Sequence, residues 1–569
     1  MSLFGSIQMG GNTLRAMQIG LHVVGNNIAN ANTPGYVRQE AVFVPGPIQQ
    51  QGRLILGTGV LVDSIVQKLD SFIQERIVGA RSDRAGAEVQ EQVYYDIELV
   101  LNALNESGGL SNSLTNFFNS IHDVLDNPGS VETRNLAIGA GSTLASVIGD
   151  LHGGVFTIRR DLDTRITSLA DEINGLSEEI RLLNIQIAST EGGDASGSQA
   201  ASLRVQRQNA VDRLSEVVGV RVDEQPSGGL SIAVGGEFLV FEGQRREVAI
   251  ATLAEGGTSL GGIEFADTHS PLNTTSGELQ GLYTARDEIV GSFLERLDDL
   301  AGTLAFEFNK VFSQGQGLVG FNELTSVETV DDENAALDAA GLPFTPVSGS
   351  FNVVLTSKTD RTQTQTHTLH IDLNGLDEDT SLASLAEQLD AIDGLSASIS
   401  SAGALQLSTD SDDSEYSFER DTSGVLAALG LNTFFTGSTA ATLGVNAELQ
   451  GIENAARFAA SLGGIGVGAG NAEDLAALLD QPLESAGEAS LIDLYNQLLN
   501  EVTRGSAIAQ SMAEGFRVFE GTLEGQQQAI SGVSIDEEAV KMITLQRIYQ
   551  ASARYIQTVS ELLDLMVNL

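Results

Sequence analysis

Four short stretches of the sequence contain residue types that could act on a substrate or bind an ion. The first, Gly257-Thr-Ser-Leu-Gly261, has the G-x-S-x-G spacing of a nucleophile elbow, in which a tight strand-to-helix turn exposes a serine. The surrounding pattern predicts no strand before it and no helix after it, so we expect a glycine-rich loop without a catalytic role. The sequence contains no recognisable Ser/His/Asp set, zinc-protease motif or kinase motif, and it predicts no catalytic residue and no enzyme.

The other three stretches are possible ion-binding sites. His367 and His370 are three positions apart in a predicted strand, where an odd separation directs two side chains to opposite faces, so a shared metal is not expected. The segment Asp410–Glu415 contains four carboxylates but lacks the glycine and terminal glutamate of an EF-hand loop, and it predicts a solvated hairpin turn. The glycine-rich segment 463–470 has no P-loop lysine and predicts a connector. We therefore expect no metal and no cofactor.

The composition excludes several classes of function. The 569 residues include 76 acidic and 30 basic side chains, giving a formal net charge of −46, and such a surface repels the phosphate backbone of nucleic acids. The absence of cysteine excludes disulfides, thiolate metal sites and cysteine nucleophiles. No apolar run approaches the roughly 20 residues that cross a bilayer, and the N-terminus lacks the pattern of a cleavable secretory signal. The sequence therefore predicts a multidomain protein with no membrane span and no nucleic-acid partner.

Amphipathic helices are predicted at both ends of the chain. Near the N-terminus, large apolar residues recur at steps of three, four and seven positions, which places them on one helical face. These residues are Ile7, Leu14, Met17, Leu21, Val24 and Ile28. Near the C-terminus, a heptad rhythm runs through Met542, Leu545, Tyr549, Ser552, Ile556, Val559, Leu563 and Met566. Since narrow apolar faces are not stable in water, we expect the two helices to pack on each other or on neighbouring subunits.

Three asparagines lie within the register of the first helix, just before its predicted end at Asn32-Thr-Pro-Gly35. Asn26, Asn27 and Asn30 lower the helix propensity unless their amides are hydrogen-bonded. The simpler interpretation is a helix exit, because asparagine favours turns. The apolar face at the other end of the chain leads us to favour contacts of these amides with another chain or segment.

Between the two ends, a helical rod and a set of inserted strands are predicted. The clearest helix lies at 162–187, where four heptads of large aliphatic residues alternate with charged ones. Further helices are expected at 85–105, 110–127, 279–311 and 491–523. Strands are expected at 230–234, 237–241, 351–357, 366–373 and 404–410, with a short helix at 381–392. The fold class is therefore multidomain and mainly α, with α+β and β insertions, of which residues 321–450 are strongly acidic.

The two ends of the chain resemble a known family. The segment NNIANANTPGY (26–36) and the last segment (531–569) are similar to the N- and C-terminal signatures of bacterial flagellar axial proteins, a group of rod, hook and hook-associated proteins. Three further details favour the hook-associated branch of this group. They are Val37-Arg38-Gln39 after Tyr36, GVSIDEE (532–538) before the last helix, and FEFNKVFSQGQGL (306–318). The insertion at 345–440 carries no part of the resemblance.

The resemblance implies a particular architecture. The N- and C-terminal helices would form an antiparallel coiled coil that lines the inner tube of a helical assembly. A helical rod domain and outward-projecting central domains rich in strands would follow. The corresponding domains are a terminal domain of 1–60 with 535–569, a rod of 61–215 with 450–534, a mixed β/helix domain of 216–320 and an acidic α+β domain of 321–449.

The resemblance also implies a structural protein that joins the flagellar hook to the filament. Its expected partners are further copies of itself, the hook protein, hook-associated protein 3 and a flagellar export chaperone. Its expected location is the extracellular flagellum, reached by type III export without a cleaved signal. The expected subunit contacts are Leu14, Met17, Leu21, Val24, Asn26, Asn27, Ile28, Asn30, Tyr549, Ile556, Val559, Leu563 and Met566. Two alternatives stay open, namely another axial protein of the hook or distal rod, and a secreted adhesin-like protein with its activity in 345–440.

Overall fold

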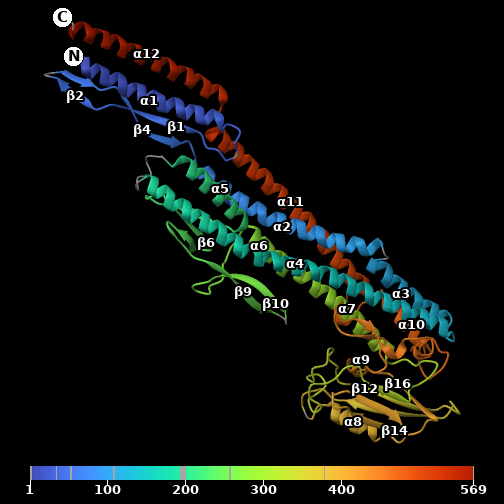
Figure 1. Ribbon diagram of the computed structural model, residues 1–569. Helices are drawn as coiled ribbons and strands as arrows, with labels where there is room; N and C mark the ends of the chain where they lie inside the picture. The colour runs from blue at the N-terminus through green and yellow to red at the C-terminus, as the bar shows by residue number, and fades with distance from the viewer. Residues whose placement is uncertain are drawn as a thin grey trace. The chain divides into compact units, whose positions relative to one another are not determined.

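The structure is a computed structural model that describes residues 3–33, 35–51, 54–106, 109–191, 200–255, 258–376 and 378–567 (Figure 1). As predicted, the protein is mainly helical and contains several small antiparallel sheets. Its residues form two compact units. The first unit comprises Met1–Val93, Asp161–Arg286 and Ala507–Leu569, and the second comprises Tyr94–Arg160 and Asp287–Ser506. Among the described residues, no helix is both long enough and apolar enough to cross a membrane.

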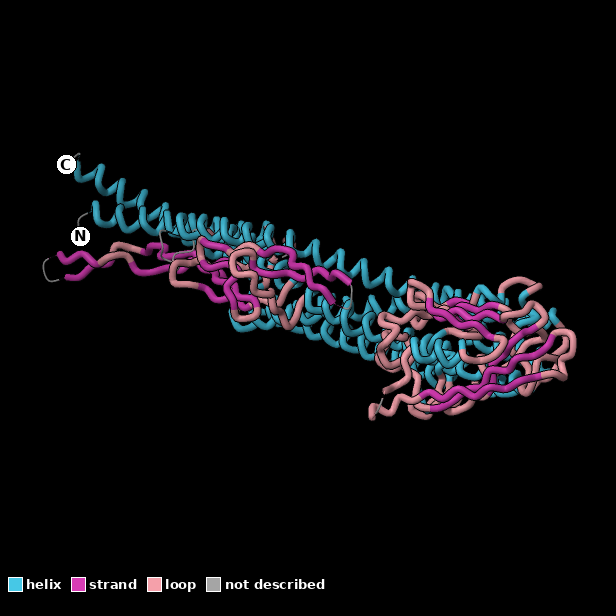
Figure 2. The backbone as a smooth tube through the Cα atoms, turned by 90° about the horizontal axis from the view of Figure 1, so that it is seen from below, coloured by secondary structure: helices cyan, strands magenta, loops and turns pink. Residues whose placement is uncertain are grey.

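The helices of the first unit come from distant parts of the sequence. α1 (Leu3–Ala29) and α12 (Ile535–Val567) lie side by side, with the N-terminal end of α1 next to the C-terminal end of α12 (Figures 1 and 2). Three long helices contribute residues to both units, namely α2 (Ser71–Glu106), α4 (Val131–Glu191) and α11 (Leu491–Ser531). Two shorter helices belong to the first unit alone, namely α5 (Ala201–Val217) and α6 (Glu278–Tyr283).

The predicted heptad helix at 162–187 forms the second half of α4. Its aliphatic face is the core of the first unit, where Ile166 and Ile180 are fully buried. A flanking side chain of the same helix, Asn174, donates through Nδ2 to the carbonyl of Val248 at 2.8 Å and accepts from the Val248 N–H at 3.0 Å. α4 is therefore fixed to a strand on its flank as well as to the apolar core.

Small antiparallel sheets complete the first unit (Figure 1). The predicted hairpin at 230–241 is present, and its turn at Gly235-Gly236 has φ values of 58° and 90°, which glycine adopts without strain. The four-stranded sheet has the order β5 (Arg221–Glu224), β6 (Leu230–Val234), β7 (Glu237–Phe241) and β8 (Gln244–Arg245). The paired strands are β1 (Gln39–Pro45) with β4 (Val60–Gln67), β2 (Ile48–Gln51) with β3 (Leu54–Gly57), and β9 (Val248–Glu255) with β10 (Thr258–Phe265).

A cluster of ion pairs joins α2, α5 and α11 within the first unit. Arg81 of α2 contacts Asp212 of α5 at 3.0 Å and Glu520 of α11 at 2.9 Å. Arg84, one turn later on α2, contacts Glu520 at 2.5 Å and Glu216 of α5 at 3.0 Å. Burial lowers the pKa of Arg81, but Asp212, Glu520 and their hydrogen bonds raise it above its ordinary value. The three helices are thus held by charges that lie mostly out of solvent.

The core of the second unit is a cluster of phenylalanine rings. Phe117 of α3 (Gly109–Asp126) and Phe308 of α7 (Val290–Phe312) have ring centroids 5.1 Å apart, and Phe434 lies 5.1 Å from Phe308. All three side chains are fully buried, and tilted aromatic pairs of this kind stabilise a core beyond the area they bury. Around this cluster lie α9 (Val425–Leu429), α10 (Gly470–Ala477) and the short strands β17 (Phe435–Thr436) and β18 (Gly444–Val445).

The predicted α+β insertion is part of the second unit. Its strands form two antiparallel sheets, ordered β13-β12-β16 and β11-β15-β14, and α8 (Leu382–Asp390) packs against them. The strands are β11 (Glu323–Thr325), β12 (Gly349–Ser357), β13 (Thr364–Ile371), β14 (Leu395–Ile399), β15 (Leu405–Thr409) and β16 (Ser414–Glu419). Every strand and helix that the sequence predicts between 351 and 410 has a counterpart within a few residues of its expected bounds.

Two sequence predictions need correction. The predicted continuous helix at 279–311 is divided into α6, a π-helix (Thr284–Ile289) and α7. The G-x-S-x-G segment is not a loop, because Thr258–Gly261 belongs to β10, and β9 precedes it; Gly257 lies outside the described residues. The sequence pattern did not predict this pair of antiparallel strands, because β9 and β10 contain glycine, alanine and acidic residues, which have a low strand propensity.

The remaining candidate ligand residues lie in ordinary structural positions. On β13, His367 is half-buried and His370 is exposed. The acidic segment forms the turn between β15 and β16, although Glu415 at its end is buried and accepts the Gly320 N–H at 2.8 Å. The glycine-rich segment 463–470 leads into α10. Within the described ranges, no group of three or more His, Asp or Glu side chains is arranged to hold a metal ion.

Candidate assembly site at the terminal helices

The two terminal helices meet along their length in antiparallel directions. Near the start of α1, Gly10 lies against Ile556 of α12, and at the end of α1, Asn27 bonds to Glu538 near the start of α12. Rising residue numbers in α1 therefore meet falling numbers in α12. On its other side α1 contacts β1 and β4, so this small sheet and α12 enclose it from two directions.

Glycines of α1 allow the two helices to approach closely. A Cβ atom on Gly10 would lie 2.5 Å from Cγ1 of Ile556, and one on Gly20 would lie 3.2 Å from Cδ1 of Leu545. Both distances are too short for an unaltered packing. Gly11, which follows Gly10 on a different side of the helix, would meet nothing within 4 Å. Gly10 thus marks where α12 excludes a side chain, and Gly20 marks where α12 and Phe43 of β1 together exclude one, since Phe43 Cζ would lie 3.0 Å from the added Cβ.

The predicted contact residues of α1 differ in burial. Three are buried, namely Met17, Val24 and Asn27. Five are half-buried, namely Leu14, Leu21, Asn26, Ile28 and Asn30. The buried face of α1 also contains residues outside the predicted apolar spacing. Four of these residues are small, and the fifth is a valine: Ser6, Gly10, Ala16, Gly20 and Val23. The helix interface is therefore narrower and composed of smaller residues than the sequence predicts.

The predicted contact residues of α12 lie on two sides of that helix. Val559 is buried, and Ile556 and Leu563 are half-buried on the side of α1. Tyr549 and Met566 are 38% and 65% exposed. They belong to a larger group of exposed apolar side chains on α12, which also includes Val540, Ile543, Ile548, Tyr555, Leu562 and Leu565. We refer to this group as the exposed α12 face. The described residues leave 38–65% of each of these side chains exposed.

A buried polar network closes the junction between α1, β1 and α12. Asn27 is its centre and uses its whole amide. Nδ2 donates to Glu538 Oε2 at 2.9 Å and to the Gln39 carbonyl at 2.8 Å, while Oδ1 accepts from Tyr36 Oη at 2.9 Å and from the Gln39 N–H at 3.0 Å. Arg38 donates through Nε to Glu538 Oε1 at 3.0 Å. We call Asn27, Tyr36, Arg38, Gln39 and Glu538 the terminal network.

Charge compensation explains how Glu538 can be fully buried. Arg38 Nη2 lies 2.9 Å from Glu538 Oε1 and 3.0 Å from the neighbouring Glu537 carboxylate, and Lys541 Nζ lies 3.5 Å from Glu538. A buried carboxylate is tolerated when it is paired and hydrogen-bonded in this way. Burial and the negative charge of Glu538 raise the pKa of Tyr36 to about 12, so its hydroxyl stays a donor to Asn27 over the physiological range.

The sequence did not predict this network. The pattern places Asn27 in a helix, and it contains Arg38 and Glu538 within the family motifs, but spacing cannot show that residues 500 positions apart pair with each other. The other two asparagines behave differently, because Asn30, one residue after α1, donates through Nδ2 to Asn26 Oδ1 at 2.9 Å. The available signal was chemical, since a buried helix asparagine requires partners that its own helix does not supply.

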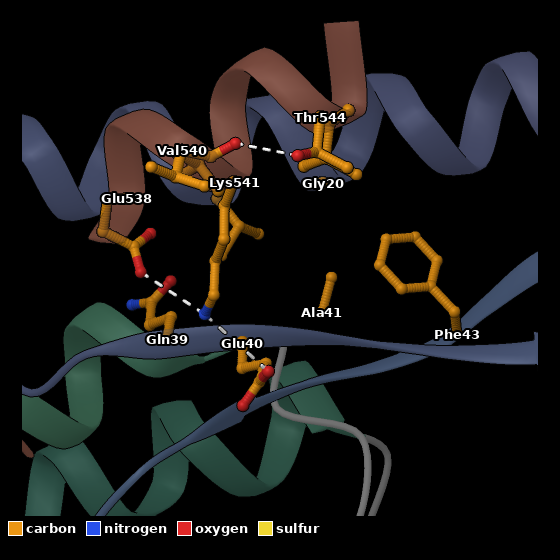
Figure 3. A pocket seen from close by; sticks show the side chains of 12 residues that line it. Gly20, Gln39, Glu40, Ala41, Phe43, Glu538, Val540, Lys541 and Thr544 are labelled. Carbon is orange, nitrogen blue, oxygen red and sulfur yellow. Dashed lines mark hydrogen bonds and ion pairs between the residues drawn. The ribbon is translucent and has the colours of Figure 1, made fainter. Parts of the chain in front are cut away.

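A small pocket lies beside the terminal network, between α1, β1 and the start of α12 (Figure 3). Its volume is about 260 Å³. Figure 3 shows Lys541 reaching from α12 toward Glu40 of β1, with Nζ 3.9 Å from a Glu40 carboxylate oxygen. Burial raises the pKa of Glu40, but a hydrogen bond from Lys68 and the nearby cationic charges lower it to a net value below the ordinary one. The rest of the lining is mainly apolar, from Val23, Val24, Ala41, Phe43, Val540 and Leu545.

Three family models match the chain. The model for the "Flagellar hook-associated protein FlgK helical domain" matches residues 95–324. The models "Flagella basal body rod protein" and "Flagellar basal body rod FlgEFG protein C-terminal" match residues 7–36 and 526–569. The two terminal matches contain Asn27 and Glu538, so the hydrogen bond between these residues joins the two matched segments.

Three proteins, each named flagellar hook-associated protein 1, are similar to the chain over nearly its whole length. The protein of Salmonella typhimurium (strain LT2) is 25% identical over 588 residues, covering 98% of both chains. The protein of Escherichia coli (strain K12) is 25% identical over 579 residues with the same coverage. The protein of Bacillus subtilis (strain 168) is 24% identical over 601 residues, covering 100% of this chain and 98% of its own.

One solved structure is also similar, that of the flagellar hook junction protein FlgK from Burkholderia pseudomallei. It aligns with 80% of this chain and 100% of its own, with a TM-score of 0.48 and 14% sequence identity. The classification rests on the family models and on the end-to-end relatives, which agree with the resemblance of the terminal motifs. The chain is thus similar over nearly its whole length to proteins named flagellar hook-associated protein 1, and its residues 95–324 match the model of the FlgK helical domain.

Proposed function

We propose that the protein is a structural adaptor at the tip of the flagellar hook, where it joins the hook to the filament through the next hook-associated protein. The observation that carries this proposal is the pair of terminal helices. One side of the pair is closed within the chain by the terminal network, and the exposed α12 face is left open. Monomeric proteins rarely expose many large apolar side chains along one helix unless a partner covers them.

The charge distribution supports assembly through the same helices. The whole chain carries a net charge of −46, which makes copies repel one another. α1 and α12 together contain four basic and five acidic side chains, and α1 contains no acidic residue. Copies can therefore approach along the terminal helices with little electrostatic cost, while the acidic remainder of the chain disfavours other contacts. Supercoiling of α1 and α12 into an antiparallel coiled coil, with Leu14, Leu21, Tyr549 and Met566 facing neighbours, is part of the proposal.

The terminal network gives the assembly a folding step. Isolated helices are marginal in water, so α1 and α12 require each other or a neighbour to stay ordered. Because Asn27 and Glu538 come from opposite ends of the chain, the network forms only when both ends are present and folded. Such a chain can pass unfolded through an export channel, without disulfides to reduce because it has no cysteine, and can order its ends at the assembly site.

Partners and location follow from this role. We propose contacts with further copies of the chain, with the hook protein on one side and with hook-associated protein 3 on the other, after delivery by an export chaperone to the extracellular flagellum. The terminal domain would comprise 1–60 with 535–569, and the rod 61–215 with 450–534. The domains of 216–320 and 321–449 would project outward, which places the strongly acidic module on the outside.

A paired substitution on α12 tests the proposal. Leu562 and Leu565 belong to the exposed α12 face, so changing both to aspartate leaves the fold of the monomer intact but places two charges at the subunit interface. The matched control is Gln550→Asp, because Gln550 is exposed on the same helix but is not apolar. Cells carrying the paired variant should form hooks without filaments and release flagellin, and control cells should swim. Normal filaments with the paired variant would contradict the proposal.

A further inference from the structure

The chain contains two asparagine–glycine steps within almost identical local sequences. They are Ile173-Asn-Gly-Leu176 and Leu373-Asn-Gly-Leu376. Asparagine is a thermolabile residue. A following glycine removes the side chain that would hinder its backbone nitrogen from reaching the asparagine amide carbon. Since the flanking residues are so similar, any difference in reactivity between these two steps must come from the fold.

The first step is protected by its surroundings. Asn174 and Gly175 lie in the middle of α4, where the Gly175 N–H belongs to the helical hydrogen-bond ladder. The Asn174 amide is held at both ends by Val248, through Nδ2 at 2.8 Å and Oδ1 at 3.0 Å. Helical backbone geometry also keeps the Gly175 nitrogen away from the Asn174 side-chain carbon. A reaction here requires local unfolding of the helix.

The second step lies open to solvent in the second unit. Asn374 and Gly375 are exposed in the connection that follows β13, and the next residue, Leu376, is 83% exposed. The Gly375 N–H lies outside the helices and strands of the described chain and donates to the side chain of Asp379 at 2.9 Å. Asn374 Oδ1 accepts the Leu376 N–H at 2.8 Å, which holds the amide over its own turn. Gly375 has a φ of +69°, so the turn depends on glycine at this position.

We propose that Asn374-Gly375 is a self-modification site at which asparagine is converted to aspartate and isoaspartate after the protein has folded. The Gly375 nitrogen loses its proton to water or hydroxide and forms a bond to Cγ of Asn374. The bond from Cγ to Nδ2 breaks, and Nδ2 leaves as ammonia after gaining a proton. Water then opens the resulting succinimide at either carbonyl, and no oxidant or reductant is consumed. This chemistry goes beyond the structural role proposed above.

The modification changes the surface without disturbing the core. The two ends of the loop are tied together, because the Thr380 N–H donates to the Asp372 carbonyl at 2.7 Å and the Asp372 N–H donates to Thr380 Oγ1 at 2.9 Å. These bonds keep β13 and α8 in place when the turn at Asn374 is altered. The product adds one negative charge to a module that is already strongly acidic, and isoaspartate adds one atom to the backbone path.

Peptide mass spectrometry of the full-length chain tests this inference. After incubation at mildly alkaline pH, we expect deamidation of Asn374 to be more than about tenfold faster than that of Asn174, because only the latter needs helix opening. Isoaspartate should appear in the same peptide when it is labelled by an isoaspartyl methyltransferase. In concentrated urea the two rates should converge, since the local sequences are so similar.

A variant separates the site from background chemistry. In Asn374→Gln the longer side chain disfavours the five-membered ring, so isoaspartate labelling of the folded chain should fall to the level of its other peptides. Equal rates at Asn174 and Asn374 in the folded chain, or labelling that persists unchanged in Asn374→Gln, would overturn the inference. Neither result depends on whether the chain joins hook to filament, so failure here leaves the proposed function standing.

Discussion

The side chains of Asn27 and Glu538 are 511 positions apart in the sequence and are joined by a hydrogen bond of 2.9 Å at a fully buried position. The same asparagine binds both the N–H and the carbonyl of Gln39 and accepts the Tyr36 hydroxyl. One amide therefore fixes the end of α1, the turn after it, the start of β1 and the first turns of α12. Because every polar atom of this amide is used, the network specifies a single arrangement of the two chain ends.

Replacing Asn27 with alanine should loosen both terminal helices together. The change removes four hydrogen bonds and leaves buried partners unsatisfied, which costs about 2–3 kcal/mol. Amide hydrogen exchange should report faster opening in α1 and in α12 to the same extent. Asn30→Ala is the matched control, because its amide bonds to Asn26 and Thr33, which are both close to it in sequence. Loss of protection in α1 alone would show that the amide does not couple the two ends.

Arg38 should be more sensitive to substitution than other arginines of the terminal region. Arg38→Ala leaves Glu538 buried without its main cation, and breaking a buried pair in this way costs about 3–5 kcal/mol. Arg38→Lys should recover only part of this loss, because an ammonium group cannot reproduce the two-nitrogen contact of the guanidinium. Arg15→Ala, at an exposed position of α1, is the control.

A second substitution checks the mechanism of that loss. If the cost comes from an uncompensated charge, Glu538→Gln added to Arg38→Ala should restore stability relative to the single variant. Urea unfolding followed by circular dichroism measures both changes. A double variant less stable than Arg38→Ala would show instead that the guanidinium acts mainly through its packing.

The fold and the site were predictable to different degrees, for physical reasons. Large apolar side chains at regular spacing predicted both terminal helices and the second half of α4. The first half of α4 was missed because its glycines lower the helix propensity. At one of these positions, Gly141, the structure shows why glycine is present, since a Cβ atom there would lie 2.5 Å from the Phe434 ring. Close packing against an aromatic ring requires glycine at this position, and the glycine weakens the helix pattern in the sequence.

Within the site, the same distinction holds. Val24 and Val559 are large, periodic and buried, and periodicity alone places them on the helix faces. Gly10 and Gly20 are small, so they carry no hydrophobic signal although they determine how closely the helices pack. Arg38 and Glu538 are charged residues of opposite chain ends, and their pairing is a property of the tertiary structure.

Tyr36 should make the terminal region sensitive to alkaline pH. Its pKa is raised from the ordinary 10.0 to about 12 by burial and by the charge of Glu538. The folded state holds the Tyr36 proton more tightly than the unfolded state does. The free energy of unfolding is therefore unaffected by this tyrosine below its ordinary pKa, and it falls as the pH rises from the ordinary pKa to the raised pKa of the folded state. Urea unfolding at about pH 9 and about pH 11 should therefore show a larger loss of stability for the natural chain than for Tyr36→Phe. Equal losses would mean that Tyr36 does not titrate in this range.

The ion-pair cluster of the first unit should be selectively sensitive at Glu520. This carboxylate contacts both Arg81 and Arg84 and is only 10% exposed. Glu520→Gln keeps the shape but removes the charge, and we expect a loss of about 2–3 kcal/mol that high salt does not abolish, because buried pairs are weakly screened. Glu514→Gln is the control, since Glu514 is exposed on the same helix. Thermal unfolding in low and high salt distinguishes them, and equal shifts for the two variants would contradict the assignment.

Adjacent glycines of α1 provide the sharpest test of the helix pairing. Gly10→Val introduces a side chain at a position where even a Cβ atom would lie 2.5 Å from Ile556, whereas Gly11→Val points into open space. Both changes have the same effect on intrinsic helix propensity, so their difference measures the packing against α12. Overpacking of this kind costs about 1–3 kcal/mol, and we expect Gly10→Val to be less stable than Gly11→Val by that amount. Hydrogen exchange in α12, which neither substitution touches in sequence, is the decisive measurement. If α12 is equally protected in both variants, α1 and α12 do not pack through Gly10.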